Sequence, residues 1–397
     1  MDKRKKLVIM CASLSNGGAE RVVSILSQEL SQSYEISLIL FDGDDVTYKY
    51  SGKIINLGFK GVVARVKRFL PISHLTTFVA LLYLIFKVRK IKKSINPDCS
   101  ISFLETPNIV NLASSLNEKI IVSVRSTRSL QNRTFYERVE NKFIRFYKKA
   151  DYIVSTSEGV KEDLVEVFDL PSEKIVTIYN PFQKGIIRNL MEEALESECK
   201  YFIDSHKAII TVGRLIPQKN HLRLLHTIAQ IKTEIPNIGY VIVGSGEMLS
   251  TLKEKAKELN IEESVLFIPF TKNPFKYIAQ SQLFVSTSER EGFCNTLVEA
   301  MICKVPVVAV DCKSGPREII SGKSNYQVDS FETKICDKGI LVPLQKHDLN
   351  GQLLYDAVKR GLTDNNIRSY ITSGTELWIE SLQVDSIVRK WKHFIEN

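Results

Sequence analysis

Short apolar runs alternate with helix-like segments along the whole chain. Each run holds four to six residues and leads into polar or small ones, which is typical of strands buried in a parallel sheet. In the first half of the chain the spacing predicts two helices, Ala19–Leu30 and Glu137–Lys149. The strands expected there are Leu7–Cys11, Ile36–Phe41, Cys99–Phe103, Ile120–Val124 and Tyr152–Thr156.

The pattern stops at Asn180-Pro181 and restarts after a polar linker helix that is expected over Asn189–Lys200. The second series predicts strands Ala208–Val212, Tyr240–Val243, Val265–Ile268, Leu283–Ser286 and Pro306–Val310. The helices expected with them are His221–Thr233, Met248–Leu259, Thr296–Cys303 and Arg317–Ile320. Two successive series of this kind indicate an α/β protein with two doubly wound parallel sheets, whose ligands bind at the carboxyl ends of strands.

The length of 397 residues also favours two domains, because a single hydrophobic core stops growing at about 250–300 residues. We expect an N-terminal Rossmann-like domain over residues 1–185 and a C-terminal one over residues 186–380, facing each other across a cleft. In the remaining residues, 381–397, the helical segment Val384–Phe394 contains Trp391 and is a candidate to cross back to the N-terminal domain.

The composition, 44% hydrophobic and 25% charged, excludes a disordered chain, a collagen-like repeat and a small disulfide scaffold. The seven cysteines are scattered without a C-x-x-C pair or zinc-type spacing, so we expect reduced thiols in a cytoplasmic protein and no structural metal site. No apolar run reaches the roughly 18 residues of a membrane span, and the basic start leads into a strand rather than a signal-peptide core.

The formal net charge of +9 lies in the first half of the chain. Residues 1–190 carry 29 Lys and Arg against 19 Asp and Glu, whereas residues 191–397 carry 25 against 26. This asymmetry indicates that one half faces a membrane surface, a phosphorylated substrate or a nucleic acid. Nucleic acid is the weakest of the three, because the basic residues lack interleaved aromatic or groove-reading motifs.

A glycine pair follows the first strand, in Ser15-Asn16-Gly17-Gly18-Ala19-Glu20-Arg21. Gly17 and Gly18 let a ligand approach backbone N–H groups at a helix start, which suits an anion. The motif is not G-x-G-x-x-G, which weakens a dinucleotide interpretation, and a plain glycine turn explains it equally well.

The first strand of the second series leads into a basic loop that begins at Gly213. Arg214 and Lys219 place two cations at the carboxyl edge of the sheet, where a fork-shaped guanidinium and a compact ammonium suit phosphate oxygens. A solvated basic loop is the alternative. Asn220 is expected to cap the helix that follows.

The most informative loop follows the fourth strand of the second series and carries Glu291 and Gly292 before a helix that begins near Asn295 or Thr296. Glu291 can reach into the cleft, and the helix start supplies N–H groups and a positive dipole end. Carboxylates accept hydrogen bonds from hydroxyls, so this loop suits a sugar or a ribose. A capping box from Thr296 to Glu299 explains Glu299 without a ligand but leaves Glu291 unexplained.

Together these loops resemble the large family of retaining glycosyltransferases with two Rossmann-like domains, family 4 with the GT-B fold. The matching motifs stand in family order: Gly-Gly-Ala-Glu at 17–20, Gly-Arg-Leu-x-x-x-Lys-Asn at 213–220, Val-Gly-x-Gly at 243–246, Glu-Gly-Phe-x-Asn-x-x-x-Glu-Ala at 291–300 and Gly-Pro-x-Glu-Ile at 315–319. Each motif is weak alone, but their order and the spacing of the two glutamates make the match specific.

The resemblance implies a nucleoside-diphosphate sugar as donor and no cofactor or metal. Arg214 and Lys219 would hold the diphosphate, Glu299 would bind the ribose hydroxyls, and Glu291 would contact the donor sugar. The catalytic set would be Glu291, Arg214 and Lys219, since two cations and a helix dipole can offset the charge on the leaving diphosphate. The rest of the donor site would comprise Gly17, Gly18, Gly213, Gly244, Gly292, Phe293, Cys294, Asn295 and Thr296.

One stretch departs from the family pattern. Many members carry a His after the fourth N-terminal strand, where this chain has Arg125 and Arg128. Either arginine is a candidate to bind the sugar donor or an acceptor phosphate, and surface arginines are the alternative. No nucleophile is evident in the sequence, so the resemblance implies retention by front-face attack within an ion pair.

The apolar stretch His74–Phe86 is flanked by cations, with Arg65, Lys67 and Arg68 before it and Lys87, Arg89, Lys90, Lys92 and Lys93 after it. Such a segment suits attachment to an anionic leaflet or a lipid-diphosphate acceptor. A core-packed helix with a solvated basic tail is the alternative.

The combined interpretation is an enzyme that transfers a hexose or N-acetylhexosamine from a nucleoside-diphosphate sugar, with UDP favoured, to a growing glycan. The run Gly-Pro-Arg-Glu-Ile-Ile resembles transferases of surface-polysaccharide assembly, such as lipopolysaccharide or capsule. The acceptor options include a polyprenyl-diphosphate-linked glycan at the inner face of the cell membrane. The alternatives are a sugar-nucleotide epimerase or hydrolase on the same fold and a non-catalytic sugar-nucleotide-binding partner, against which the intact loop residues argue.

Overall fold

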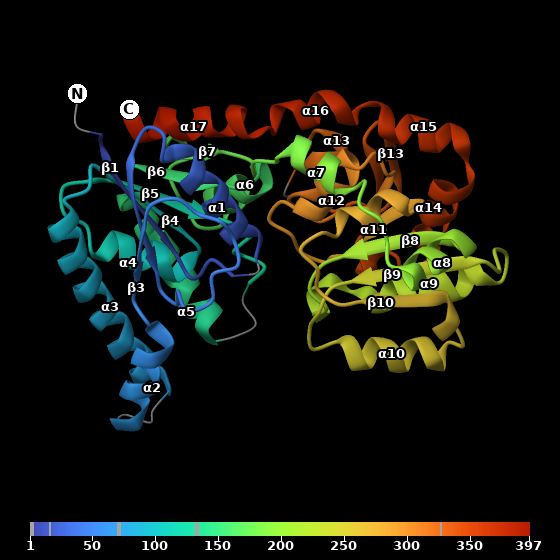
Figure 1. The fold of residues 1–397 in the computed structure, drawn as a ribbon, viewed down its shortest axis with the longest axis horizontal. Helices are drawn as coiled ribbons and strands as arrows, with labels where there is room; N and C mark the ends of the chain where they lie inside the picture. The colour runs from blue at the N-terminus through green and yellow to red at the C-terminus, as the bar shows by residue number, and fades with distance from the viewer. Residues whose placement is uncertain (1–3, 16, 70–72, 132–134, 326–327) are drawn as a thin grey trace. The chain divides into compact units, whose positions relative to one another are not determined.

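The computed structural model describes residues 4–15, 17–69, 73–131, 135–325 and 328–397. It divides into two compact units (Figure 1). Unit 1 comprises residues 1–181 and 384–397, and unit 2 comprises residues 182–383. The sequence places the same divisions at 185/186 and 380/381.

Unit 1 is built on a seven-stranded parallel sheet with the strand order β3-β2-β1-β4-β5-β6-β7. Its strands are β1 (Lys6–Cys11), β2 (Glu35–Leu40), β3 (Lys53–Asn56), β4 (Cys99–Phe103), β5 (Lys119–Val124), β6 (Tyr152–Ser155) and β7 (Ile175–Thr177). The five strands predicted for this half agree with these bounds to within one residue. The sequence missed β3 and β7, because both are short edge strands whose residues are mostly half-exposed.

Helices cover both faces of this sheet (Figure 1). They are α1 (Gly18–Leu30), α2 (Phe59–Phe69), α3 (Ser73–Ile95), α4 (Glu105–Ala113), α5 (Phe135–Ile144), η1 (Arg145–Lys149), α6 (Glu158–Glu166), η2 (Ser172–Lys174) and α17 (Val384–Glu396). Along β1, Leu7 and Ile9 face α1 and α17, while Val8 and Met10 face α3 and α4. Burial on both faces explains why a parallel strand is a continuous apolar run in the sequence.

The C-terminal helix α17 belongs to unit 1, although unit 2 precedes it in the chain. Its buried residues Ile387, Trp391 and Ile395 pack in one cluster with β1 and α1. The Trp391 ring is 1% exposed, and its centroid lies 5.6 Å from that of Phe103 on β4. The last segment of the chain therefore completes the core of the N-terminal domain.

Unit 2 has a second seven-stranded sheet, with the order β10-β9-β8-β11-β12-β14-β13, in which the pair β13–β14 is antiparallel. Its strands are β8 (Lys207–Val212), β9 (Ile238–Val243), β10 (Val265–Ile268), β11 (Leu283–Ser286), β12 (Val307–Val310), β13 (Lys334–Cys336) and β14 (Gly339–Val342). The five strands predicted here agree to within two residues, and the hairpin of β13 and β14 was not predicted.

The helices of unit 2 complete a second Rossmann-like domain. They are α7 (Lys184–Leu190), α8 (Ser197–Ser205), η3 (Pro217–Lys219), α9 (His221–Lys232), α10 (Leu249–Glu258), η4 (Glu262–Ser264), α11 (Phe275–Gln280), α12 (Asn295–Ile302), α13 (Pro316–Ser321), η5 (Gln345–His347), α14 (Gln352–Thr363), α15 (Asn365–Ser373) and α16 (Thr375–Ser381). Across the described ranges, no helix of either unit is long and apolar enough to cross a membrane.

The linker helix predicted over residues 189–200 is wrong. The chain forms α7 and α8 instead, and residues 191–196 between them are a turn and an extended segment. Tertiary contacts hold this break: Asn273 donates a hydrogen bond to the Leu190 carbonyl, 2.8 Å. Glu196 accepts hydrogen bonds from Lys276, 2.8 Å, and the Tyr277 hydroxyl, 2.6 Å.

Candidate active site

The loops that the sequence singles out in unit 2 lie at the carboxyl ends of β8 and β11, which are neighbouring parallel strands. Between these two strands the connections of the sheet run in opposite directions, because β9 lies on one side of β8 and β11 on the other. In doubly wound sheets such a switch point is where ligands bind. The structure therefore brings the loop at 213–220 beside the loop at 287–295.

Lys219 and Glu291 meet at this point, with Nζ 2.6 Å from Oε1. Their side chains are 19% and 11% exposed, so the pair is partly shielded from water but still open to a ligand. Two further bonds tie the loops together: Thr287 Oγ1 donates to the Lys219 carbonyl, and the Glu289 N–H donates to the Gln218 carbonyl, both 2.9 Å. The cation and the carboxylate are thus held in place by backbone contacts.

The ion pair keeps Lys219 charged. Burial by itself would lower the pKa of Lys219, but the nearby Glu291 carboxylate outweighs it and raises that pKa. Burial, with the Glu291 charge adding to it, raises the pKa of the Cys294 thiol to about 12. A protonated, buried thiol is a poor nucleophile, so Cys294 is unsuited to covalent catalysis.

Arg214 supplies a second cation in the same loop. Its side chain is exposed and forms no ion pair within the described part of the chain. Its positive charge repels that of Lys219 and so acts to lower the pKa of Lys219. Two cations this close to each other suit the oxygens of a diphosphate.

Glycines allow the loops to pack backbone against backbone. A Cβ on Gly244, at φ +152°, would lie 1.9 Å from the Gly213 carbonyl oxygen. A Cβ on Gly315, at φ +75°, would lie 2.5 Å from the Phe293 carbonyl oxygen. At Gly244 and Gly315 the backbone of a neighbouring loop thus occupies the space that a side chain would need.

The helix after Glu291 begins at Asn295, as expected, but its capping differs from the prediction. Its N-cap is Cys294, in the left-handed region at φ +73°, and within the described residues no side chain caps it. Thr296 lies inside the helix, so the predicted capping box is wrong and does not account for Glu299. The Glu299 side chain is buried, 3% exposed, and the Phe293 ring packs between Phe182 and Trp378.

Asn220 also differs from the prediction, since its side chain makes no capping bond in the part of the chain that the structure describes. Its amide instead donates to Glu289 Oε1, 2.8 Å, and to Gln345 Oε1, 2.7 Å. Gln218 donates in the same way to the Arg290 carbonyl, 2.6 Å. The sequence missed this polar frame because its members lie up to 125 residues apart.

In unit 1 the glycine pair starts α1, with Gly17 at the N-cap and Gly18 as the first residue; Asn16 lies outside the described residues. A Cβ on Gly17 would lie 2.0 Å from Glu20 Oε2, so the Glu20 carboxylate folds over this glycine. Glu20 belongs to the quoted motif, but the sequence suggested no role for it.

Arg125 lies just beyond the carboxyl end of β5 and is not the surface arginine of the alternative interpretation. Its guanidinium donates to Asn180 Oδ1 and to Ser123 Oγ, the latter 3.3 Å away, and lies 5.8 Å from the centre of the Phe103 ring. Burial lowers the pKa of Arg125 to about 10, against the opposite effect of charge on Cys11 and Glu20. Asn180 was visible in the sequence only as part of the Asn-Pro pair that ends the first series.

Arg128 is 1% exposed, so the surface alternative is also wrong for this residue. It pairs with Glu105, 3.1 Å, and with Glu140, 3.2 Å, and its Nη2 donates a hydrogen bond to Asn141 Oδ1, 3.0 Å. Its charge is already neutralised by two carboxylates that lie on α4 and α5. The geometry thus favours a role for Arg128 in holding these helices together.

Two family models match the chain: Glycosyltransferase Family 4 over residues 16–183 and Glycosyl transferases group 1 over residues 197–335. The N-acetylgalactosamine-N,N'-diacetylbacillosaminyl-diphospho-undecaprenol 4-alpha-N-acetylgalactosaminyltransferase of Campylobacter jejuni is 32% identical over 92% of this chain and 92% of its own length. The chain belongs to this glycosyltransferase family. The resemblance drawn from the loop motifs is therefore confirmed.

A second Campylobacter jejuni relative of this glycosyltransferase, a GalNAc-alpha-(1->4)-GalNAc-alpha-(1->3)-diNAcBac-PP-undecaprenol alpha-1,4-N-acetyl-D-galactosaminyltransferase, is 23% identical over 98% of both chains. Among solved structures, HepE from Anabaena in complex with UDP and glucose superposes with a TM-score of 0.74, at 16% identity over 99% of this chain and 100% of that one. This likeness confirms the predicted fold, with two Rossmann-like domains of the GT-B type.

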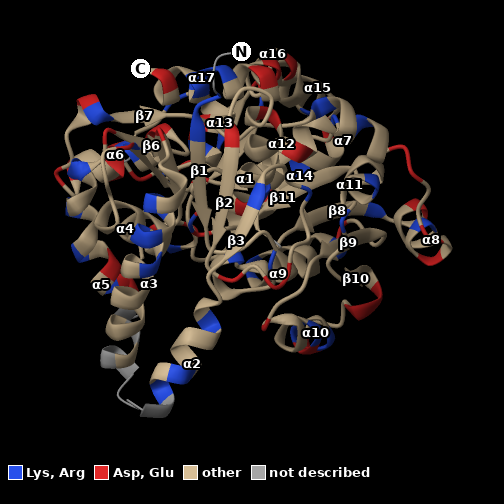
Figure 2. Cartoon of the chain, turned by 60° about the vertical axis from the view of Figure 1, so that its left-hand side comes forward, with Lys and Arg blue, Asp and Glu red and all other residues tan. Residues whose placement is uncertain are grey.

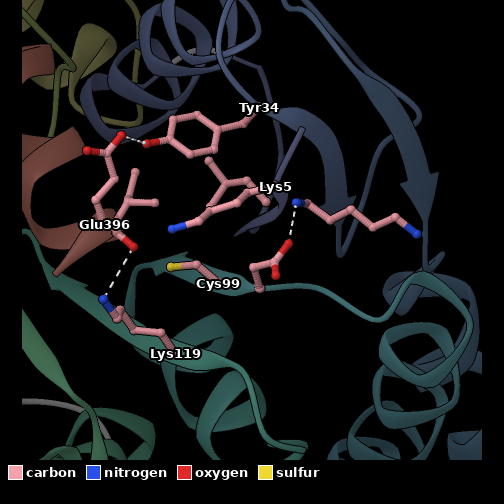
Figure 3. Close-up of a pocket in the computed structure, with 9 residues that line it drawn as sticks. Lys5, Tyr34, Cys99, Lys119 and Glu396 are labelled. Atoms are coloured by element: carbon pink, nitrogen blue, oxygen red, sulfur yellow. Dashed lines mark hydrogen bonds between the residues drawn. The ribbon is translucent and has the colours of Figure 1, made fainter. Parts of the chain in front are cut away.

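The glycosyltransferase also has a cavity of about 260 Å³ at the amino ends of β1, β4 and β5 (Figure 3). Here the Tyr34 hydroxyl donates to Glu396 Oε1, 2.7 Å, and Lys119 Nζ donates to the Ile395 carbonyl, 3.3 Å. Ile395 and Glu396 both belong to the last turn of α17, and Figure 3 shows Glu396 beside the Tyr34 ring. This edge of the sheet lies opposite the strand ends that carry the motifs, and its contacts fasten the C-terminal helix.

The described residues of the glycosyltransferase hold no group of three or more His, Cys, Asp or Glu side chains that could ligate a metal ion. Asp311, at the end of β12, pairs with Arg317 Nε, 2.7 Å away. Arg317 also donates to the Val328 carbonyl, 2.6 Å. The arginine of the Gly-Pro-x-Glu-Ile motif is thus engaged in holding its own loop.

Proposed function

We propose that this glycosyltransferase moves a hexose or an N-acetylhexosamine from a nucleoside-diphosphate sugar, with UDP favoured, to a growing glycan on polyprenyl diphosphate. The observation that carries the proposal is the Lys219–Glu291 ion pair at the switch point of the sheet, with Arg214 beside it. The names of the two Campylobacter jejuni relatives, which specify undecaprenol-linked acceptors, support the acceptor class.

The pair suits a diphosphate linked to a sugar, because one ligand can then contact Lys219 with its phosphate and Glu291 with its sugar. The Lys219 ammonium has three N–H donors, so it can keep its bond to Glu291 while it donates to a phosphate oxygen. The second Glu291 oxygen accepts from a hydroxyl of the donor sugar, and Arg214 contacts the diphosphate. Glu299 is assigned to the ribose hydroxyls, as the family resemblance implies.

Transfer breaks the bond between the anomeric carbon and the diphosphate oxygen and forms a bond from that carbon to the acceptor hydroxyl oxygen. The proton of the acceptor hydroxyl passes to the departing diphosphate. Fixed cations at Lys219 and Arg214 stabilise the charge that grows on the leaving group, which is the largest contribution such a site makes. This chemistry uses no cofactor and no metal.

Retention is part of the proposal, with attack on the face that the diphosphate leaves. The protonated Cys294 thiol and the engagement of Glu291 with Lys219 both disfavour a covalent intermediate. With a donor that is α-linked to its nucleotide, the α linkage in the names of both Campylobacter jejuni relatives corresponds to retention.

Arg125 is proposed to contact the acceptor diphosphate or the sugar donor from unit 1. Its bond to Asn180 fixes the guanidinium at the carboxyl end of the sheet, where ligands of such domains bind. Arg128 is assigned a supporting role, because Glu105 and Glu140 already pair with it. The acceptor would be presented at the inner face of the cell membrane.

The test is a panel of UDP-hexoses and UDP-N-acetylhexosamines, each incubated with and without a polyprenyl-diphosphate-linked glycan and analysed by product mass. We expect one donor to add a single sugar residue to the acceptor, with an α anomeric signal by NMR. Release of free sugar without acceptor would indicate a hydrolase, and an altered sugar on the nucleotide would indicate an epimerase. Nucleotide binding without any turnover would indicate a non-catalytic partner.

A further inference from the structure

Helix α3 has two apolar faces, of which the fold covers one. The buried stripe recurs at every fourth residue and comprises Thr76, Ala80, Leu84, Val88 and Lys92, each at most 2% exposed. The opposite stripe is 37–71% exposed and comprises Phe78, Val79, Leu82, Tyr83 and Phe86. The helix therefore packs in the core with one face, as the core-packed alternative expects, and presents an apolar surface on the other.

The exposed stripe is continuous. Phe78, Leu82 and Phe86 are spaced four apart, so they lie above one another on one side of the helix over about 12 Å. Val79 and Tyr83 fill the adjacent row. Exposed apolar side chains are common singly, but a contiguous stripe of five large ones on a surface helix marks an interaction site.

The same face of α3 becomes cationic toward its C-terminal end. Arg89, Lys90 and Lys93 follow Phe86 at positions three, four and seven residues further on, and all three are exposed. Lys92 is the exception in this basic run: it is buried and bonded to Glu118, so its predicted place among the surface cations is wrong.

The neighbouring helix α2 adds to this charge, because its Arg65 and Lys67 are exposed. Figure 2 shows Lys and Arg positions along α2. Between Asp45 and Asp98 the chain contains eleven Lys and Arg and no Asp or Glu. Such a one-sided charge next to an apolar stripe is the composition of surfaces that bind anionic lipid.

We propose that the exposed stripe of α3, with the cations of α3 and α2 around it, docks on an anionic lipid bilayer. The aromatic and aliphatic side chains enter the boundary between headgroups and acyl chains, and Arg89, Lys90 and Lys93 contact the headgroup phosphates. The inference rests on the proposed function only in that a lipid-linked acceptor would be located in a bilayer.

Apolar burial and electrostatic attraction determine how strongly each substitution should weaken vesicle binding. Removing one aromatic side chain from the acyl boundary weakens partitioning about tenfold or more. Each lysine near an anionic surface contributes about fivefold, and salt screens that part of the affinity.

The test is cosedimentation of the full chain with vesicles of phosphatidylglycerol and phosphatidylcholine, compared with vesicles of phosphatidylcholine alone. We expect binding to the anionic vesicles, weakened about a hundredfold in Leu82→Ser/Phe86→Ser and about twentyfold in Lys90→Glu/Lys93→Glu. The matched controls are Leu377→Ser, at an 88% exposed leucine on α16, and Lys257→Glu, at an exposed lysine on α10. Both controls are expected to bind like the wild type.

Equal binding of all four variants and the wild type would overturn the proposal. A wild-type dimer in gel filtration that Leu82→Ser/Phe86→Ser converts to monomer would also overturn it, because a second copy would then cover the stripe. Vesicle binding requires no turnover, so it is unaffected if the proposed acceptor is wrong. Conversely, if the wild type does not transfer sugar to a soluble acceptor analogue, the proposed function is contradicted, whereas the proposed docking surface is not.

Discussion

Lys219 and Glu291 are 72 residues apart in the chain and form an ion pair of 2.6 Å where β8 and β11 end side by side. Hydrogen bonds from the Thr287 hydroxyl and the Glu289 N–H to backbone carbonyls of the facing loop fix the two loops, so neither charged group has to be ordered by the ligand. A cation aimed at a leaving diphosphate is most effective when it is held in advance. Removal of either member of this pair should therefore affect binding or turnover of the sugar donor.

Replacing Lys219 with Met is expected to weaken UDP binding and to lower kcat/KM with a sugar donor by about 10²–10³-fold, because a preorganised charge on the leaving group is lost. Glu291→Gln is expected to leave UDP binding within a fewfold of wild type and to lower kcat, because its carboxylate is assigned to the sugar rather than the diphosphate. Calorimetry with UDP and turnover of the sugar donor measure the two effects separately.

Lys257→Met is the control for these variants, since Lys257 is an exposed lysine on α10 of the same unit. It is expected to match the wild type in both measurements. If Lys219→Met is folded and keeps wild-type affinity for UDP, the assignment of Lys219 to the diphosphate is incorrect.

The strands could be predicted from the sequence to the extent that they are buried on both faces. In β1 every residue from Leu7 to Cys11 is buried, so its apolar run is uninterrupted. The edge strand β3 pairs on one side and is half-exposed, so Lys53–Asn56 looks like the loops around it. A large apolar residue, Trp391, indicates that α17 packs against a core. The sequence does not show that its partner is Phe103 on β4, because the two are almost 300 residues apart.

The candidate site could be predicted as a set of residues but not as a geometry. Glu291 and Lys219 were identified from their loops, yet nothing in the sequence shows that they bond to each other. The capping box failed because Cys294 adopts φ +73°, a conformation that sequence rules assign to Gly or Asn. The polar frame of Asn220 and Gln345 was missed because such contacts exist only after the sheet has formed.

Gly244→Ala is expected to destabilise unit 2, because the added Cβ would lie 1.9 Å from the Gly213 carbonyl oxygen, a backbone atom that cannot move away alone. We expect a loss of at least about 2 kcal/mol in the free energy of unfolding, together with weaker UDP binding, since the Gly213 loop carries Arg214. Denaturant unfolding and calorimetry measure the two effects.

The matched control is Gly185→Ala, because a Cβ on this helical glycine would meet nothing within 4 Å. Alanine is the better helix former, so this variant is expected to be equal to or slightly more stable than the wild type. Equal stability of Gly244→Ala and the wild type would show that the two loops can separate without cost.

Lys92→Met is expected to cost about 3–5 kcal/mol of stability, because it leaves the Glu118 carboxylate buried without its cation. Lys92 Nζ lies 2.6 Å from both Glu118 Oε1 and Asn111 Oδ1, and the side chains of the ion pair are 0% and 1% exposed. Burial lowers the pKa of Lys92 and the Glu118 carboxylate opposes that shift. Denaturant unfolding at neutral pH measures the change.

Lys93→Met serves as the control, since Lys93 is the next residue along α3 and is exposed. It is expected to change stability by less than about 0.5 kcal/mol. The double variant Lys92→Met/Glu118→Gln removes both charges and is expected to regain part of the loss. If Lys92→Met is as stable as Lys93→Met, Glu118 has another way to be neutralised.

His221 is expected to make the stability of the protein fall between pH 6.5 and pH 4. Burial, aided by the nearby charge of Lys219, lowers the pKa of His221 to about 4, while its bond to the Arg214 backbone opposes the shift. In this window the unfolded chain, with a His pKa near 6.5, binds a proton that the folded protein does not. Stability therefore rises with pH through the window and is lost as pH falls, by about 2 kcal/mol between pH 7.5 and pH 4.5.

The variant His221→Phe isolates this contribution, because its ring fills the same space and cannot be protonated. The Tyr240 hydroxyl, 3.3 Å from His221 Nδ1, keeps its hydrogen bond with Thr211 in the variant. Unfolding free energies at pH 7.5 and pH 4.5 are compared for the two proteins, and the wild type is expected to lose about 2 kcal/mol more than the variant. The same loss in both proteins would mean that His221 is not buried in its neutral form and that the pH dependence comes from other groups.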